Sequence, residues 1–142
     1  KEKLIYVESE SKKIGKVNLP DNLIKKIRES SCINLNVNFN NRIEFLLKEY
    51  EHYVENKELL CSHLDNLSQL HGNRKITEWK KMIKGGDLQF FISDLLQNHY
   101  DPAYKKSIQK NFIAFNKSHN ICVNQIDNRS LTPIAIKIIS LN

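Results

Sequence analysis

The fold of this chain turns on one stretch near its start, residues 4–15, which reads LIYVESESKKIG. Four apolar residues come first, and the next six carry two carboxylates, two hydroxyls and two ammonium groups. The pattern predicts a buried strand over 3–7, a charged loop over 8–16 and a helix beginning at Pro20. Ligands of open α/β sheets bind beyond the carboxyl ends of strands, so this loop is a candidate site for a phosphate or a metal-bound phosphate. The alternative is a solvated turn whose charges neutralise one another.

The alternation of strands and helices continues to residue 54. Residues 32–38 alternate between apolar side chains and asparagines, which predicts a strand with one buried side. A helix capped by Asn38 or Asn40 follows, with Arg42 in its first turn. Strand, helix, strand, helix is typical of a parallel α/β sheet, but two strands do not make a stable sheet alone. We therefore expect further strands upstream of Lys1, in agreement with the absence of a methionine at that position.

The pattern changes after residue 54. Apolar stripes at helical spacing predict successive helices. The breaks between them are expected at Gly72, at Gly85-Gly86 and at the segment 99–102, which ends with a proline. Strands are expected at 112–115 and 121–126, and a final helix opens after Asp127. The predicted organisation has three segments: a partial α/β subdomain over 1–54, a helical region over 55–111, and a tail with a hairpin and a helix over 112–142.

The composition limits the classes of partner. The formal net charge of the 142 residues is +6, which suits an anionic partner such as RNA. No apolar run reaches the length of a membrane span and no secretory signal is present, so no membrane partner is expected. Three cysteines cannot all pair, and reduced thiols are typical of a cytoplasmic protein.

Aromatic and basic residues are interleaved in the region 100–117. Aromatic rings stack on bases while lysines contact phosphates, which makes this region a candidate RNA-binding surface. At helical spacing, burial of Tyr104 in the core is the better expectation. The candidate tRNA-binding residues are Lys105, Lys106, Lys110, Tyr100 and Tyr104.

Other candidate sites have weaker support in the sequence. His99 adjoins Tyr100 and Asp101 and forms a titratable cluster, or else belongs to a tight turn. A basic residue in the first turn of a helix opposes the helix dipole, so Arg42 either reaches a phosphate or pairs with a carboxylate such as Glu49. The spacings Cys61-x-His63 and His119-x-x-Cys122 are loose for a structural zinc site, and no metal site is expected. The sequence contains no phosphate loop, dinucleotide fingerprint or nucleophile elbow.

The stretch 7–15 followed by Leu19-Pro20 resembles a signature of bacterial tRNA 2-selenouridine synthase, a selenophosphate-dependent enzyme. Later landmarks agree in order, namely Leu46-Leu47 with Tyr50, Gly85-Gly86-Asp87, and the segment 99–104. The resemblance covers roughly residues 4–110. It implies a rhodanese domain and a Walker A loop upstream of Lys1. None of the three cysteines lies in a rhodanese-type loop, so no catalytic cysteine is expected in this chain.

The resemblance implies that the chain is the C-terminal fragment of a transferase that converts wobble 2-thiouridine of tRNA to 2-selenouridine, and that also transfers a geranyl group. The implied fold is α/β, the C-terminal part of a P-loop-type parallel sheet followed by a mainly helical region. Selenophosphate and geranyl diphosphate are then the co-substrates of the complete enzyme, with a nucleotide and Mg²⁺ as further candidates and none held tightly by the fragment. The implied residues at the rim of the phosphate pocket are Glu8, Glu10, Ser11, Lys13 and Arg42.

A second hypothesis is a non-catalytic basic module that binds RNA or a protein. The two hypotheses differ in what precedes Lys1 in the gene. Under the first, the isolated fragment is expected to be inactive, to depend on its upstream portions as partners, and to self-associate through an exposed sheet edge.

Overall fold

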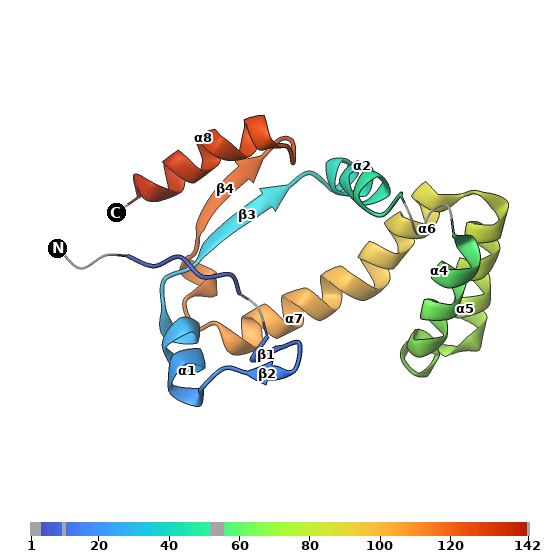
Figure 1. Cartoon of the computed structure of the whole chain (residues 1–142), viewed down its shortest axis with the longest axis horizontal. Coiled ribbons are helices and arrows are strands. Elements are labelled where there is room, and N and C mark those ends of the chain that lie inside the picture. Colours follow the sequence, from blue (N-terminus) through green and yellow to red (C-terminus); the bar gives the residue numbers. More distant parts are fainter. Residues whose placement is uncertain (1–3, 10, 52–55, 142) are drawn as a thin grey trace. The chain divides into compact units, whose positions relative to one another are not determined.

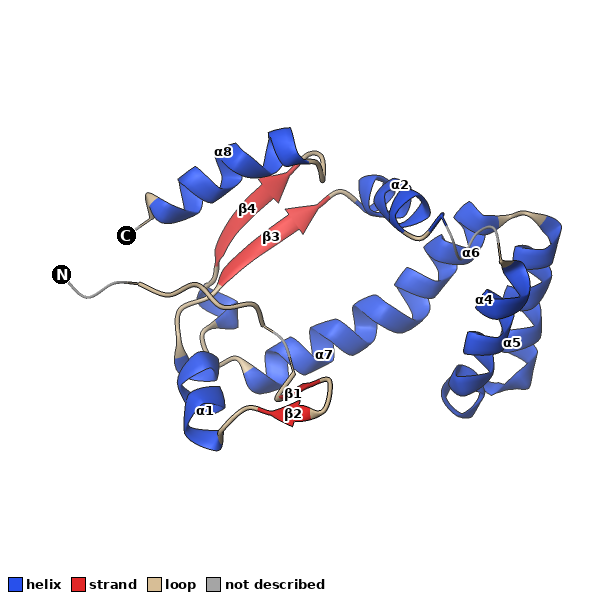
Figure 2. Ribbon diagram, in the orientation of Figure 1, coloured by secondary structure: helices blue, strands red, loops and turns tan. Residues whose placement is uncertain are grey.

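The structure is a computed structural model that describes residues 4–9, 11–51 and 56–141. It is mixed α/β and mostly helical, with a small parallel two-stranded sheet (Figures 1 and 2). The chain divides into two compact units, Lys1–Asn36 with Ala103–Ile121, and Val37–Pro102 with Cys122–Asn142. The division into three segments drawn from the sequence remains a prediction.

The first unit begins with a small hairpin. Strands β1 (Lys13–Ile14) and β2 (Val17–Asn18) pair antiparallel, with Lys13 opposite Asn18. The turn between them contains Gly15 at φ +60°, a left-handed conformation that glycine adopts without a steric penalty. Helix α1 (Asp21–Glu29) follows directly, with Pro20 at its N-cap and Ile24 buried. The predicted loop and helix are confirmed, and the loop contains a hairpin that the sequence pattern did not indicate.

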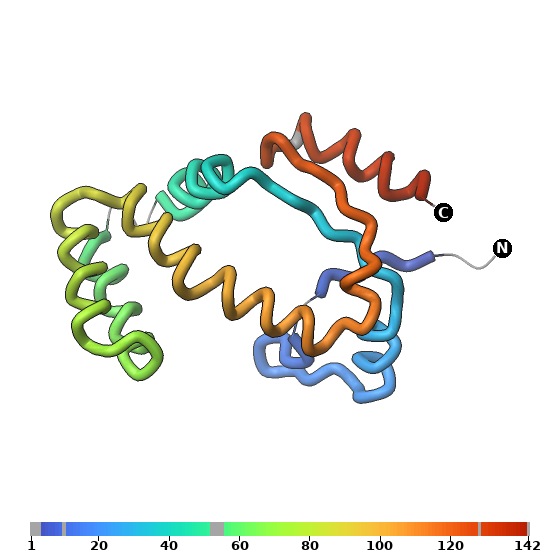
Figure 3. Tube along the Cα trace, turned by 180° about the vertical axis from the view of Figure 1, so that it is seen from behind, coloured from blue at the N-terminus to red at the C-terminus, as the bar shows by residue number. Residues whose placement is uncertain are grey.

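The larger sheet joins two distant segments. Strands β3 (Ile33–Val37) and β4 (His119–Val123) lie side by side and point the same way (Figures 2 and 3). The His119 amide donates to the Cys32 carbonyl at 3.0 Å at one end of the pair. The strand predicted over 32–38 is therefore confirmed, and its partner comes from near the other end of the chain.

Two predicted strands are wrong. Residues 4–7 form no strand, and Ile5 is 83% exposed, because no strand in the described part of the chain pairs with them. The hairpin expected from 112–115 and 121–126 is also absent. Residues Phe115–Lys117 form a 3₁₀ turn, η3, and the following strand pairs with β3 instead.

The second unit is built mainly from helices with local stop signals. Asn38 accepts a hydrogen bond from the Asn40 amide at 2.9 Å and caps its first helix. Gly72 at φ 76° interrupts one helix, and Gly86 at φ 91° ends it, as predicted. The helices are α2 (Phe39–Glu49), α4 (Lys57–Leu64), η1 (Asp65–Leu67), α5 (Ser68–Gly85), α6 (Leu88–Leu95), η2 (Leu96–Tyr100) and α8 (Asn128–Ile139).

The core of this unit packs around the only tryptophan. Trp79 and Ile83 are fully buried, and Phe91 lies with its ring centroid 6.3 Å from that of Trp79. The rest of the buried cluster comes from α4 and α5, namely Cys61, Leu64 and Ile76.

The helix break expected at residues 99–102 does not occur. The chain passes from α6 through a π-helical turn, η2, into α7 (Asp101–Asn111). Pro102 cannot donate a backbone hydrogen bond and would crowd the preceding turn of a regular α-helix. A wider π turn immediately before the proline accommodates it without ending the helix.

Among the described residues, no helix is both long and apolar enough to cross a membrane.

Candidate functional site

The charged stretch borders a hollow in the first unit. The hollow has a volume of about 490 Å³, within the range of small-molecule sites. Glu8, Lys13 and Gly15 contribute to its wall. Its remaining lining is apolar: Val7, Ile14, Leu19, Ile24 and Ile27. The structure thus brings together two of the predicted rim residues, one carboxylate and one ammonium group, over an apolar floor.

The neighbours of Lys13 in the sequence have other partners. Ser11 donates its hydroxyl to the Lys13 carbonyl at 2.6 Å, which stabilises the turn into the hairpin. Lys12 pairs with Asp21, and the hydrogen bond from this ammonium lowers the pKa of the Asp21 carboxyl. Glu10 lies outside the described residues. Lys13 is therefore the lysine of this stretch that lines the hollow.

Arg42 belongs to the second unit and has a carboxylate partner. Its two terminal nitrogens donate to the two oxygens of Asp101 at 3.0 and 2.6 Å, a bidentate arrangement. The sequence suggested Glu49 as a carboxylate neighbour, and the structure gives Asp101 instead. Two of the five guanidinium donors are used by this pair, and three remain for other acceptors.

The predicted RNA-binding lysines lie on α7 and are exposed, namely Lys105, Lys106 and Lys110. Tyr104 is 59% exposed, so the expectation that it is a core residue is wrong. Its hydroxyl lies 3.3 Å from the Ser9 hydroxyl, which connects α7 to the charged stretch within the first unit. Tyr100 lies in the second unit and is 56% exposed.

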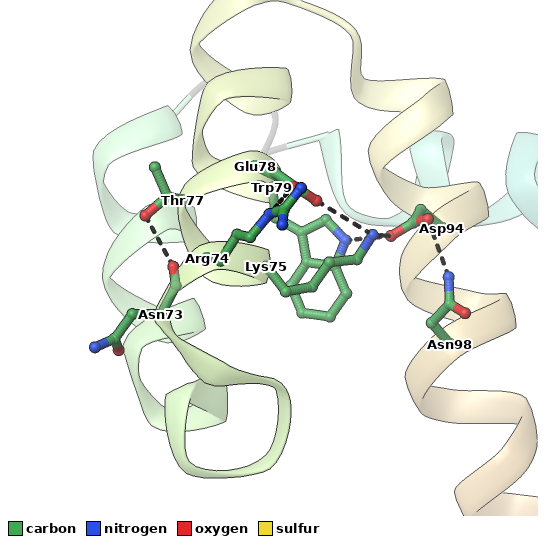
Figure 4. A network of polar contacts seen from close by, with 8 residues as sticks. All are labelled: Asn73, Arg74, Lys75, Thr77, Glu78, Trp79, Asp94 and Asn98. Atoms are coloured by element: carbon green, nitrogen blue, oxygen red, sulfur yellow. Dashed lines mark hydrogen bonds and ion pairs between the residues drawn. The ribbon is translucent and has the colours of Figure 1, made fainter.

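The second unit contains a polar network that sequence reasoning missed (Figure 4). Asp94 accepts hydrogen bonds from Trp79 Nε1 at 2.5 Å, Lys75 Nζ at 2.6 Å and Asn98 Nδ2 at 3.0 Å. Burial raises the pKa of Asp94, but the donors from Lys75, Trp79 and Asn98 outweigh it, and the net pKa is lowered. The spacing from Asp94 to Asn98 is helical, whereas no local pattern links Asp94 to Trp79 on another helix. The network stabilises the packing of α5 against α6.

His99 also has a partner that the sequence did not indicate. Its Nδ1 lies 2.9 Å from His71 Nε2, so one ring donates and the other accepts. Burial, and then the neighbouring His71, lower the pKa of His99. The His71 ring lies 5.1 Å from Trp79, centroid to centroid. This geometry favours a packed histidine pair, and the lowered pKa of His99 favours its neutral form.

Among the described residues, no group of three or more histidine, cysteine, aspartate or glutamate side chains could hold a metal ion. Cys61 is buried in the tryptophan core, and Cys122 is exposed on β4. Burial raises the pKa of the Cys32 thiol, which lowers its reactivity as a nucleophile.

These features define the class as a mixed α/β domain, mostly helical, with a hollow beside a charged hairpin. The model of the tRNA 2-selenouridine synthase AAA domain matches residues 1–85, and the chain belongs to this family. No curated protein and no solved structure matches the chain. The family is that of a transferase that modifies tRNA and uses selenophosphate. The match includes Glu8, Lys13 and Arg42, and the lysines of α7 lie beyond it.

Proposed function

We propose that this chain is the downstream part of a P-loop-type AAA domain in an enzyme that converts wobble 2-thiouridine of tRNA to 2-selenouridine. Geranyl transfer to the same sulfur is part of the proposal. The observation that carries it is the family match over residues 1–85, which includes the charged stretch and the hollow that this stretch borders. The rhodanese and Walker A portions belong upstream in this proposal, and the isolated chain is then inactive.

In the proposed site, Lys13 contacts a phosphate group of the co-substrate. An ammonium group at the wall of a hollow stabilises phosphate charge more strongly than one in bulk water. Glu8 or Glu10 orients a metal ion or a water molecule near that phosphate. Ser11 shapes the turn that presents Lys13, since its hydroxyl bonds the Lys13 carbonyl.

The residues that line the hollow fit the proposed co-substrates to different degrees. A phosphate end beside Lys13 and an apolar body over Val7, Ile24 and Ile27 suit geranyl diphosphate. Selenophosphate uses only the polar end of the same hollow. A Mg²⁺ ion there would take Glu8 and otherwise phosphate and water oxygens, as Mg²⁺ commonly does. When bound, Mg²⁺ would neutralise phosphate charge.

Arg42 and the residues of α7 have supporting roles in the proposal. In the second unit, Arg42 offers a phosphate the donors that Asp101 leaves free. Lys105, Lys106 and Lys110 contact tRNA phosphates, while the exposed rings of Tyr100 and Tyr104 stack on bases.

The test uses the complete enzyme with Glu8→Ala and Lys13→Ala, each assayed for 2-selenouridine formed in tRNA. Both variants should lose activity, and Lys13→Ala should raise the KM for selenophosphate. The matched control is Lys16→Ala, an exposed lysine of the same hairpin that does not line the hollow. Normal use of selenophosphate by both site variants would end the assignment of this hollow as the phosphate site.

A further inference from the structure

A second hollow of the first unit lies between α1 and the end of α7. Its volume is about 470 Å³, and Ile113, which is 79% exposed, stands at its edge. The amide of Ile113 donates to the Arg28 carbonyl at 3.3 Å, which ties the segment after α7 to α1. Six charged side chains line this α1–α7 hollow: Lys12, Lys25, Arg28 and Lys110 as cations, and Asp21 and Glu29 as anions.

The charges in this hollow do not cancel. Lys12 pairs with Asp21, and Lys25 lies 4.0 Å from Glu29. Over residues 4–9, 11–51 and 56–141, no carboxylate forms an ion pair with Arg28 or with Lys110. Two cations on two different helices therefore line one hollow, and neither has an ion-pair partner among the described residues.

The cations extend beyond the hollow on α7, where Lys106 does not line it. Lys106 and Lys110 are four residues apart on α7, and Lys25 and Arg28 are three apart on α1, so each pair shares one side of its helix. Four cations on two helices are more than one phosphate group needs. A polyanion with several phosphates supplies an anion for each of them, and the guanidinium of Arg28 suits a phosphodiester because it donates in a bidentate fork.

We propose that the α1–α7 hollow binds backbone phosphates of RNA, with Arg28 and Lys110 as its principal contacts. This inference rests on the proposed function, which makes tRNA the substrate, and it adds a site on α1 to the lysines of α7. The contacts are to phosphate and carry no base specificity.

The test measures binding of labelled tRNA to the full 142-residue chain over a range of salt concentrations. Each phosphate contact contributes about 0.7–0.9 to the slope of log K against log salt. Arg28→Gln and Lys110→Gln should each reduce the slope by this amount and weaken binding about four- to fivefold near 0.15 M salt. Arg28→Lys retains the charge but loses the bidentate fork, so it should keep the salt slope of the parent chain and bind more tightly than Arg28→Gln. Arg129→Gln and Lys16→Gln, which remove exposed charges elsewhere, are the matched controls.

The outcomes separate this inference from the proposed function. If Lys105→Gln and Lys106→Gln weaken binding while Arg28→Gln and Lys110→Gln behave as the controls do, the hollow is not used, and the proposed function stands without the contact from Lys110. If the parent chain binds no tRNA even at low salt, this inference fails, and the selenophosphate assay of Glu8→Ala and Lys13→Ala decides the proposed function separately. If Arg28→Gln weakens the binding of inorganic phosphate but leaves tRNA binding unchanged, the hollow is a single-phosphate site and the RNA assignment is overturned. Circular dichroism of each variant establishes that it is folded.

Discussion

Removing the carboxylate of Asp94 should destabilise the second unit more than removing any surface ion pair would. Asp94→Ala leaves the indole N–H of Trp79 without its acceptor, and the Trp79 side chain is 0% exposed. A buried donor left unsatisfied costs about 1–3 kcal/mol. Loss of the ion pair with Lys75 adds up to about 1 kcal/mol to this cost, since the side chains of Lys75 and Asp94 are only 28% and 27% exposed. We expect a loss of about 2–3 kcal/mol in the free energy of unfolding.

The assay is urea denaturation followed by tryptophan fluorescence, because Trp79 is the only tryptophan and reports on this core. Asp94→Asn keeps an acceptor for the indole and should recover part of the loss. Asp65→Ala is the matched control: Asp65 pairs with Lys80 at 2.6 Å but is 62% exposed, so its removal should cost below about 0.5 kcal/mol. If Asp94→Ala were no more destabilising than Asp65→Ala, the reasoning about the buried indole would be refuted.

The pH dependence of stability offers an independent check on Asp94. The net pKa of this carboxyl is lowered below its ordinary value of 3.8 in the folded protein. Its contribution to stability is therefore present above that value and is lost as the pH falls through the folded pKa. The parent chain should lose this contribution in acid, whereas Asp94→Ala should lack the corresponding slope in denaturation curves recorded from pH 5 downward.

Three further predictions concern other contacts. The pKa of His99 is lowered by burial and by its neighbouring histidine, so unfolding should become easier as the pH falls from about 7 through the folded pKa. His99→Gln should flatten this pH dependence in thermal denaturation, and an unchanged slope would contradict the assignment of the effect to His99. Arg42→Gln should destabilise the chain by about 1 kcal/mol, because the partly exposed pair with Asp101 is lost; a midpoint equal to that of the parent chain in urea would argue against this pair. Gly86→Ala should cost about 1–2 kcal/mol because φ is 91°, whereas Gly85→Ala, in the helix itself, should be neutral or stabilising by thermal denaturation; equal effects would show that backbone conformation is not the cause.

Elements with local signals were predictable from the sequence. Asn38 and Asp127 cap helices as expected, since a side-chain oxygen beside the first turn accepts a free amide within two or three residues. Gly86 ends a helix because it adopts a positive φ. The strand over 33–37 was evident from its alternation. In each case the determining interaction lies within a few residues.

Features that depend on distant partners were not predictable. Residues 4–7 have the composition of a strand, but a strand forms only where another strand supplies its hydrogen bonds. The contact between Trp79 and Asp94 joins two helices, and that between His71 and His99 spans 28 residues, without a shared local pattern. The family was correctly identified from the stretch 7–15, whereas the site residues remain a prediction and the hollow beside Lys13 required the fold.

The pairing of β3 with β4 has a consequence for how the protein is made and truncated. Asn34 donates to Asn120 across this pair at 2.9 Å, a separation of 86 residues in the chain. During synthesis, β3 leaves the ribosome long before its partner exists, and closing so long a loop is slow. An expression fragment cut at residue 85, where the family match ends, would omit β4 altogether. Its solitary strand would be left with open backbone groups, which invites aggregation in the cell.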